Sequence, residues 1–121
     1  MAGITTHILD VSGGIPAAGV RVELYRQSGE AWKLVRELVT NVDGRTDEPI
    51  LKPEETAIAV YELRFHIGDY FADEDNADDK VGDDVPFLDI VPVRFSISEL
   101  TRHYHVPLLV APWSYTTYRG S

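Results

Sequence analysis

The stretch that decides the fold closes the chain: HYHVPLLV at residues 103–110, APWS at 111–114 and YTTYRGS at 115–121. It predicts a strand, a turn and a second strand that runs to the last residue. His103 and His105 are two residues apart, and side chains at that spacing lie on one face of a strand. The same alternation puts Thr116 and Tyr118 together. Chain ends usually fray, so we expect this β-prone end to dock against the domain and to contribute to a site.

Upstream of this hairpin, short β-prone runs alternate with turn signals. Apolar alternation and β-branched residues predict strands at residues 4–10, 19–26, 32–40, 57–67 and 90–98. A short apolar patch predicts one helix at residues 68–77. The segment Asn41-Val42-Asp43-Gly44-Arg45 has turn chemistry, since Asn and Asp bond their own backbone and Gly supplies a positive φ. The pattern is typical of an all-β, two-sheet antiparallel β-sandwich of about eight strands, with Greek-key-like connections and one domain over residues 1–121.

Composition excludes several classes of function. The chain has 121 residues, a net charge of -9 and no cysteine. Disulfides and thiolate chemistry are therefore excluded, and the acidic balance argues against nucleic-acid or anionic-membrane partners. No apolar run approaches the ~20 residues that span a bilayer, and the first residues lack the pattern of a signal peptide. We therefore expect a cytoplasmic protein.

Four residues carry the chemistry that this sequence offers, and each also has a plain structural explanation. His7 lies mid-strand, where a partly buried, hydrogen-bonded histidine is the simpler interpretation. His103 and His105 could be metal ligands, catalytic groups or part of a solvated edge; metal is the weakest of the three, because no third ligand completes a motif. Arg45 closes a turn and alone would be an ordinary exposed arginine. The acidic run at 73–84 indicates a solvated loop, without the ligand spacing of an EF-hand calcium site.

Four blocks follow one another along the chain: THILD at residues 6–10, GIPAAGV at 14–20, TNVDGR at 40–45, and the strand from His103 to Leu109 with the tail Tyr118-Arg119-Gly120-Ser121. Together they resemble the family of transthyretin-related 5-hydroxyisourate hydrolases, over nearly the whole chain. The terminal tetrapeptide is that family's signature, whereas transthyretin itself, the hormone carrier, shares the fold but lacks this set. The departure from the family pattern is a longer acidic loop around residues 73–89.

The resemblance implies a transthyretin-like sandwich that assembles as a homotetramer, a dimer of dimers with active sites in the channel between dimers. It implies hydrolysis of 5-hydroxyisourate to 2-oxo-4-hydroxy-4-carboxy-5-ureidoimidazoline in purine and urate breakdown, with no cofactor and no metal. By motif position, the implied catalytic residues are His7, Arg45, His105 and Ser121. The implied substrate-binding residues are these four together with Tyr118, Arg119 and Gly120, while His103 and Thr116 have supporting roles.

The residue types fit this reaction. Hydrolysis of a cyclic amide needs a base that activates water and a positive group for the oxyanion. Histidine, with a pKa near ~6.5, suits the first role, and arginine suits the second but cannot be a base. The sequence leaves open whether His7 or His105 is the base. It also leaves open a non-catalytic transthyretin-like carrier of a small planar aromatic ligand, and a metal-binding sandwich that uses His7, His103 and His105.

Overall fold

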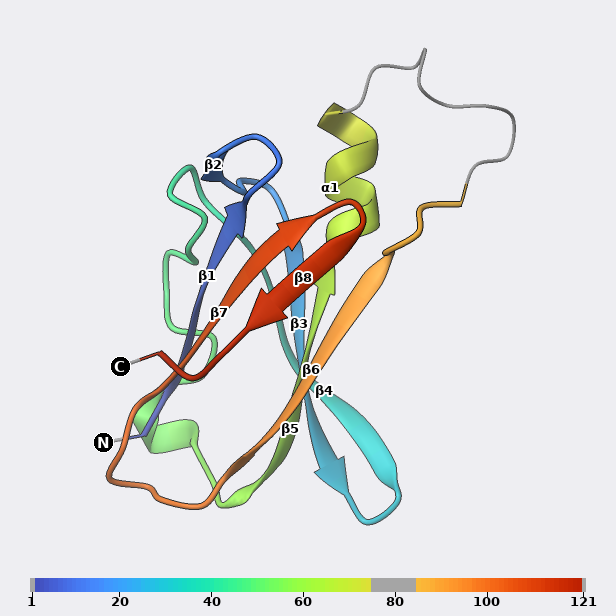
Figure 1. Ribbon diagram of the computed structural model, residues 1–121. Coiled ribbons are helices and arrows are strands. Elements are labelled where there is room, and N and C mark those ends of the chain that lie inside the picture. The colour runs from blue at the N-terminus through green and yellow to red at the C-terminus, as the bar shows by residue number, and fades with distance from the viewer. Residues whose placement is uncertain (1, 75–84, 121) are drawn as a thin grey trace.

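The computed structural model describes residues 2–74 and 85–120 (Figure 1). Within these ranges the chain forms eight strands, one α-helix and one short 3-10 helix. In chain order they are β1 (Ile4–Asp10), β2 (Ile15–Pro16), β3 (Arg21–Ser28), β4 (Ala31–Val39), the 3-10 helix (Pro53–Glu55), β5 (Ala59–His66), α1 (Ile67–Glu74), β6 (Ile90–Ile97), β7 (Tyr104–Ala111) and β8 (Ser114–Thr117). No helix among the described residues has the length and apolar character needed to cross a membrane.

Two four-stranded sheets pack face to face. Sheet A has the strand order β2-β1-β7-β8, and sheet B has the order β4-β3-β5-β6. In Figure 1 the strands β1, β7 and β8 form one layer in front of β3, β5 and β6, and α1 stands at one end of the sandwich. The expected two-sheet β-sandwich with one short helix is confirmed. The acidic run at 73–84, which we expect to be a solvated loop, lies largely outside the described ranges.

One strand pair departs from the antiparallel arrangement. Strands β1 and β7 run parallel, and their register joins Ile4 to Tyr104 at one end and Asp10 to Val110 at the other. Parallel neighbours cannot be joined by a tight turn. Here the intervening chain forms all of sheet B before it returns to sheet A. The first and last thirds of the sequence therefore meet along a full strand, which places the residues around His7 beside those around His105.

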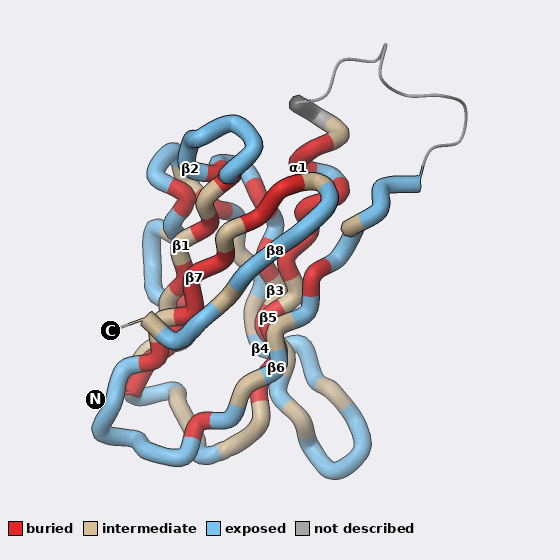
Figure 2. Tube along the Cα trace, viewed as in Figure 1, coloured by how far each residue is buried: buried red, intermediate tan, exposed pale blue. Residues whose placement is uncertain are grey.

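The core lies between the two sheets and explains which side chains face outward. In β1 the burial alternates at every residue, with Ile4, Thr6, Ile8 and Asp10 buried and the residues between them half-buried. Figure 2 shows the buried positions concentrated along β1, β7, β3 and β5, while β4 and β8 have no buried residue. Burying a large aliphatic side chain contributes about 1.5–3 kcal/mol. This contribution fixes the strand register, because a slip of one residue would turn the core side chains out to water.

The prediction that the last strand continues to Ser121 is wrong in its extent. Strand β8 ends at Thr117, and the chain rejoins the sheet only at Gly120, which forms a single bridge with His105. The Gly120 N–H donates to the His105 carbonyl oxygen at 2.8 Å. Between Thr117 and Gly120, the guanidinium of Arg119 lies over the ring of Tyr104. Ser121 itself lies outside the described residues.

The outer face of sheet B is a network of ion pairs. The Glu62 carboxylate accepts hydrogen bonds from Arg64 Nε at 2.7 Å and from Arg94 Nε at 3.1 Å. Burial favours a raised pKa for Glu62, but these two hydrogen bonds outweigh it and the pKa is lowered. His66 lies on the same sheet, with its Nε2 2.6 Å from a carboxylate oxygen of Glu23. This histidine is therefore engaged in a structural contact, on the sheet opposite to the other three.

Candidate active site

The outer face of sheet A carries the histidines that the sequence singled out. In the parallel register of β1 and β7, Thr5 is opposite His105 and His7 is opposite Pro107. All four side chains point away from the core, because their neighbours in each strand point into it. Thr5, His7 and His105 are half-buried, so solvent or a ligand can reach them. The predicted convergence of His7 and His105 on one surface is thus present in the register.

Thr5 holds two histidine rings through one hydroxyl. Its Oγ1 is 2.8 Å from Nε2 of His103 and 2.8 Å from Nδ1 of His105. Both distances are those of well-formed hydrogen bonds. The contact orients the His105 ring and engages its Nδ1, so Nε2 is the ring nitrogen that can meet a water molecule or a substrate. His103 is exposed and stands between this contact and solvent.

Gly120 brings the C-terminal tail against the His105 ring. A Cβ atom added at Gly120 would lie 2.5 Å from Cδ2 of His105 and 3.3 Å from its Cβ. No side chain fits there unless the ring or the tail moves. The Gly120 N–H also bonds the backbone carbonyl of His105, so the tail and β7 are joined at that residue. Glycine at this position therefore keeps the imidazole in place between Thr5 and the tail.

Replacing Gly120 with alanine is expected to displace the His105 ring. We expect kcat/KM to fall between ~10-fold and ~100-fold, which is the effect of moving a reacting group by about 1 Å. The matched control is Gly13→Ala, because a Cβ there meets its nearest atoms at 3.4 Å, an ordinary contact, and the residue has no positive φ. Steady-state kinetics of the two folded variants with 5-hydroxyisourate, the substrate that the sequence resemblance implies, make the comparison. Equal activity of both variants would contradict the role given to Gly120.

Arg45 is part of a turn whose backbone is hydrogen-bonded to β1. The Ile8 N–H donates to the Gly44 carbonyl oxygen at 2.8 Å. Gly44 has φ +76°, and an added Cβ would collide with the Ile8 carbonyl oxygen. The Asn41 side chain shapes the turn, because its Oδ1 accepts from the backbone N–H groups of Asp43 at 2.9 Å and Arg45 at 3.2 Å. These contacts place Arg45 one residue beyond the point at which the turn is hydrogen-bonded to β1.

The electrostatics of the site favour a neutral His105. Burial lowers the pKa of His105 below its ordinary value of 6.5, and the charges of Arg45, His103 and His7 lower that pKa further. A protonated ring would lose hydration and would face other positive charges. His105 is therefore an imidazole at neutral pH, able to accept a proton.

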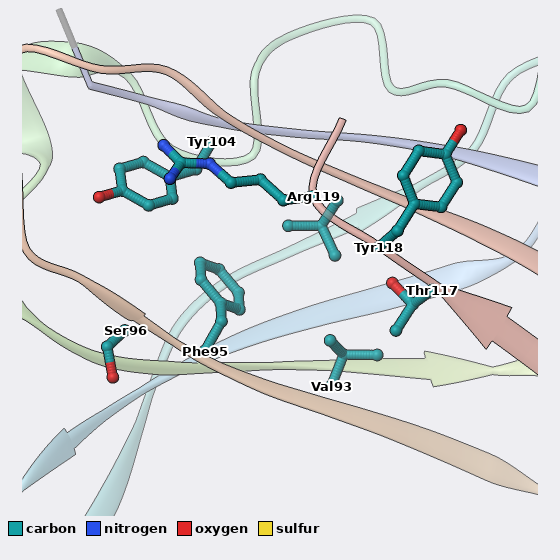
Figure 3. Close-up of a pocket in the computed structure, with 8 residues that line it drawn as sticks. Val93, Phe95, Ser96, Tyr104, Thr117, Tyr118 and Arg119 are labelled. Atoms are coloured by element: carbon teal, nitrogen blue, oxygen red, sulfur yellow. The ribbon is translucent and has the colours of Figure 1, made fainter. Parts of the chain in front are cut away.

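The other predicted residues of the last segment divide between the two sides of the sheet. Thr116 is opposite Leu109 in the register and is exposed, and Tyr118 is exposed two residues further on. Arg119 instead lies with its guanidinium 4.1 Å from the centre of the Tyr104 ring, and its Nη2 donates to the His103 carbonyl oxygen at 3.3 Å. Figure 3 shows Tyr118 pointing away from Tyr104, whereas Arg119 lies over it. Thr116 thus lies on the face of sheet A that carries His105, whereas Tyr118 and Arg119 both line a pocket between the closing hairpin and β6.

A pocket of about 190 Å³ lies on the other side of β7, between β6 and the closing hairpin (Figure 3). Its lining comes from both sheets: Val93, Phe95, Ser96, Tyr104, Val106, Thr117, Tyr118 and Arg119. This volume is below the ~300–1,000 Å³ of typical small-molecule sites. The pocket does not include the three clustered histidines. The candidate active site is therefore an open sheet face, and the pocket is separate from it.

The arrangement also bears on the metal alternative. Among residues 2–74 and 85–120, no three His, Asp or Glu side chains are grouped so that they could hold a metal ion. The ring nitrogens of His103 and His105 that face each other are both engaged by Thr5. The sequence did not single out Thr5 or Asn41 as parts of the site. Thr5 is on the same face of β1 as His7, but only the register of β1 against β7 brings its hydroxyl to both rings.

Comparison with known proteins places this site in a family. The model of the HIUase/Transthyretin family matches residues 4–120. The chain belongs to this family. A relative in the HIUase/Transthyretin family, the 5-hydroxyisourate hydrolase of Halalkalibacterium halodurans, is 52% identical over 120 residues, which cover 98% of this chain and 97% of that protein.

Solved structures of similar proteins agree with the assignment to the HIUase/Transthyretin family. A crystal structure of (S)-allantoin synthase matches 99% of this chain with a TM-score of 0.86 and 45% identity. This chain covers 44% of that protein, so the match concerns a part of it. Sea bream transthyretin in complex with thyroxine matches 98% of this chain and 94% of its own, with a TM-score of 0.84 and 25% identity. The resemblance seen in the sequence blocks is confirmed at the level of family and fold.

Proposed function

We propose that this chain is a 5-hydroxyisourate hydrolase of purine and urate breakdown. The observation that carries the proposal is the setting of His105: its ring is held by Thr5 and Gly120, and Arg45 is close enough to lower its pKa. A neutral base beside a fixed cation meets the two requirements of amide hydrolysis. The identity of 52% to a protein named 5-hydroxyisourate hydrolase supports the choice of substrate.

In this proposal His105 is the general base. Its Nε2 takes a proton from water, and the hydroxide attacks an amide-type carbonyl carbon of the ring. Arg45 orients the substrate and stabilises the negative charge that develops on the carbonyl oxygen, because its planar fork matches oxygen anions. His7 donates a hydrogen bond to the bound ring. Tyr118 and Gly120 form the floor, and Ser121, which lies outside the described residues, completes the set that the sequence resemblance implies. The product is 2-oxo-4-hydroxy-4-carboxy-5-ureidoimidazoline.

We propose that a second copy of the chain covers this face in a homotetramer built as a dimer of dimers. Arg45, His103 and Tyr118 are all exposed in one chain, with 57% of Tyr118 accessible. Small-molecule sites usually bury ~70–90% of their ligand. An open sheet face of one chain cannot bury that share of a ligand's surface. Sedimentation equilibrium of the purified protein measures the assembly, and a fully active monomer would contradict this part of the proposal.

The pH dependence of kcat/KM follows from the lowered pKa of His105. His105 must be neutral to act as a base, so activity is retained above its pKa and is lost as pH falls through it. Because that pKa is below 6.5, the acid limb of the profile lies below pH 6.5. Initial rates in a constant-ionic-strength buffer series give the profile. An inflection above pH 7, or a flat profile down to pH 5, would argue against this base.

The position of bond cleavage tests the proposed product. Hydrolysis in ¹⁸O-labelled water puts one labelled oxygen into the new carboxylate when water attacks the ring carbonyl. Mass spectrometry of the product formed within seconds of mixing, compared with a spontaneous reaction, locates the label. Enzyme-dependent product without ¹⁸O in the carboxylate would refute ring opening by water at this carbonyl.

A further inference from the structure

We propose that Thr5 joins His105 to the exposed His103 as a proton relay and acts as a positioning residue of the active site. The inference rests on the hydrolase function proposed above. It starts from one geometric fact: a single hydroxyl oxygen lies 2.8 Å from a nitrogen of each ring. The three groups come from two parallel strands whose register places Thr5 directly opposite His105. The contact is thus built into the sheet.

One hydroxyl cannot satisfy both rings in the same way. It carries one proton and two lone pairs, so it donates to at most one of the two nitrogens. At least one of His103 Nε2 and His105 Nδ1 must therefore carry a proton that is donated to Thr5. When Thr5 donates to His103, a neutral His105 has its proton on Nδ1 and its Nε2 is bare. In the reverse arrangement, with Thr5 donating to His105 Nδ1, the ring proton would be on Nε2, so the relay requires Thr5 to be the donor to His103.

The same contact lets the proton leave the site. When His105 Nε2 takes a proton from water, its Nδ1 proton passes to the Thr5 oxygen and the Thr5 proton passes to His103 Nε2. His105 is then neutral with its proton on Nε2, and His103 carries the positive charge and releases its Nδ1 proton to solvent. When His105 later gives the Nε2 proton to the departing ring nitrogen, His103 takes a proton from solvent on its Nδ1, and its Nε2 proton returns through Thr5 to restore the His105 Nδ1 proton.

The surroundings make this transfer favourable. Arg45 and His7 face His105 from the turn and from β1, and His103 faces it through Thr5; burial and these groups all lower its pKa. A lasting charge on His105 is therefore costly. His103 is exposed, so the same charge on that ring stays hydrated. The relay moves the positive charge from the half-buried ring to the exposed one.

Thr5→Val tests the relay because it keeps a β-branched side chain of similar size and removes only the hydroxyl. We expect kcat to fall between ~10-fold and ~100-fold, with little change in KM. This loss is smaller than the full rate enhancement that a positioned proton-transfer group supplies, because His105 itself remains. Thr5→Ser keeps the hydroxyl and is expected to restore most of the lost kcat. Added imidazole is expected to raise the kcat of His103→Ala, because a diffusible base replaces the exit group. Unchanged kcat in Thr5→Val would overturn the relay.

Nuclear magnetic resonance of ¹⁵N-labelled histidine provides a readout that does not depend on turnover. Bare and protonated ring nitrogens have well-separated chemical shifts. The spectrum of the full chain without substrate therefore reports whether His103 Nε2 and His105 Nδ1 carry a proton. We expect the wild type and Thr5→Ser to show His105 protonated at Nδ1 at neutral pH, and Thr5→Val to lose this preference. A His105 tautomer that is the same in all three proteins would overturn the relay. Failure of the wild type to hydrolyse 5-hydroxyisourate, with this spectrum as expected, would instead count against the proposed function.

Discussion

Replacing His105 with asparagine is expected to lower kcat/KM by ~10²- to ~10⁴-fold, the range that a positioned proton-transfer group supplies. Asparagine can keep a polar contact to Thr5 near the place of Nδ1, but it has no group that accepts a proton at neutral pH. The loss should therefore appear in kcat, with the fold and assembly retained. Circular dichroism and sedimentation establish those two properties for the variant before the kinetics are compared.

The matched control for His105 is His66→Asn. His66 is a histidine of the same chain, but it lies on sheet B and contacts Glu23. Its replacement removes the buried hydrogen-bond partner of Glu23, so thermal stability is expected to fall. The kcat/KM of the folded control should stay close to the wild-type value, because no part of this contact reaches sheet A. A similar loss of kcat/KM in both variants would show that the effect of His105→Asn is not specific to the site.

Replacing Arg45 with alanine is expected to lower kcat by ~10²- to ~10³-fold, the cost of removing one group that stabilises an oxyanion. The same substitution is also expected to change the pH dependence of kcat/KM. The Arg45 charge lowers the pKa of His105, so its removal raises that pKa and moves the acid limb of kcat/KM to higher pH. Arg45→Lys keeps the charge without the planar fork, so it should lose rate but keep the acid limb near its original position.

These two readouts separate the roles of Arg45. A drop in kcat without any shift of the acid limb would mean that Arg45 does not act on His105 electrostatically. The exposed Arg26 on β3 offers a matched control, because Arg26→Ala removes one positive charge from sheet B. The pH profile of that control should superimpose on the wild type. A profile shifted equally by both alanine variants would point to net charge alone.

The outward face of the site followed from the sequence by period-two alternation. Thr5, His7 and Leu9 alternate with buried neighbours, and the same rule paired His103 with His105 and Thr116 with Tyr118. The turn at Asn41–Arg45 also followed, because the residues there specify its geometry locally. These features depend on short-range sequence patterns, which one chain displays directly.

The rest required the pairing of distant segments. Thr5 meets His103 and His105 only because β1 and β7 run parallel with an offset of about one hundred residues, and no local pattern contains that offset. The same holds for Arg119, which the tail motif suggested as a substrate-binding residue and which lies over Tyr104 on the other side of β7. The direction in which a terminal segment leaves a sheet depends on these tertiary contacts.

The decay of freshly prepared 5-hydroxyisourate, followed by its ultraviolet absorbance with and without the purified chain, tests the central claim most directly. We predict that the wild type accelerates this decay far above its spontaneous rate, and that His105→Asn at equal concentration returns it nearly to that rate. Decay at the spontaneous rate with the wild type, together with tight binding of a planar aromatic ligand, would contradict the account and favour a carrier.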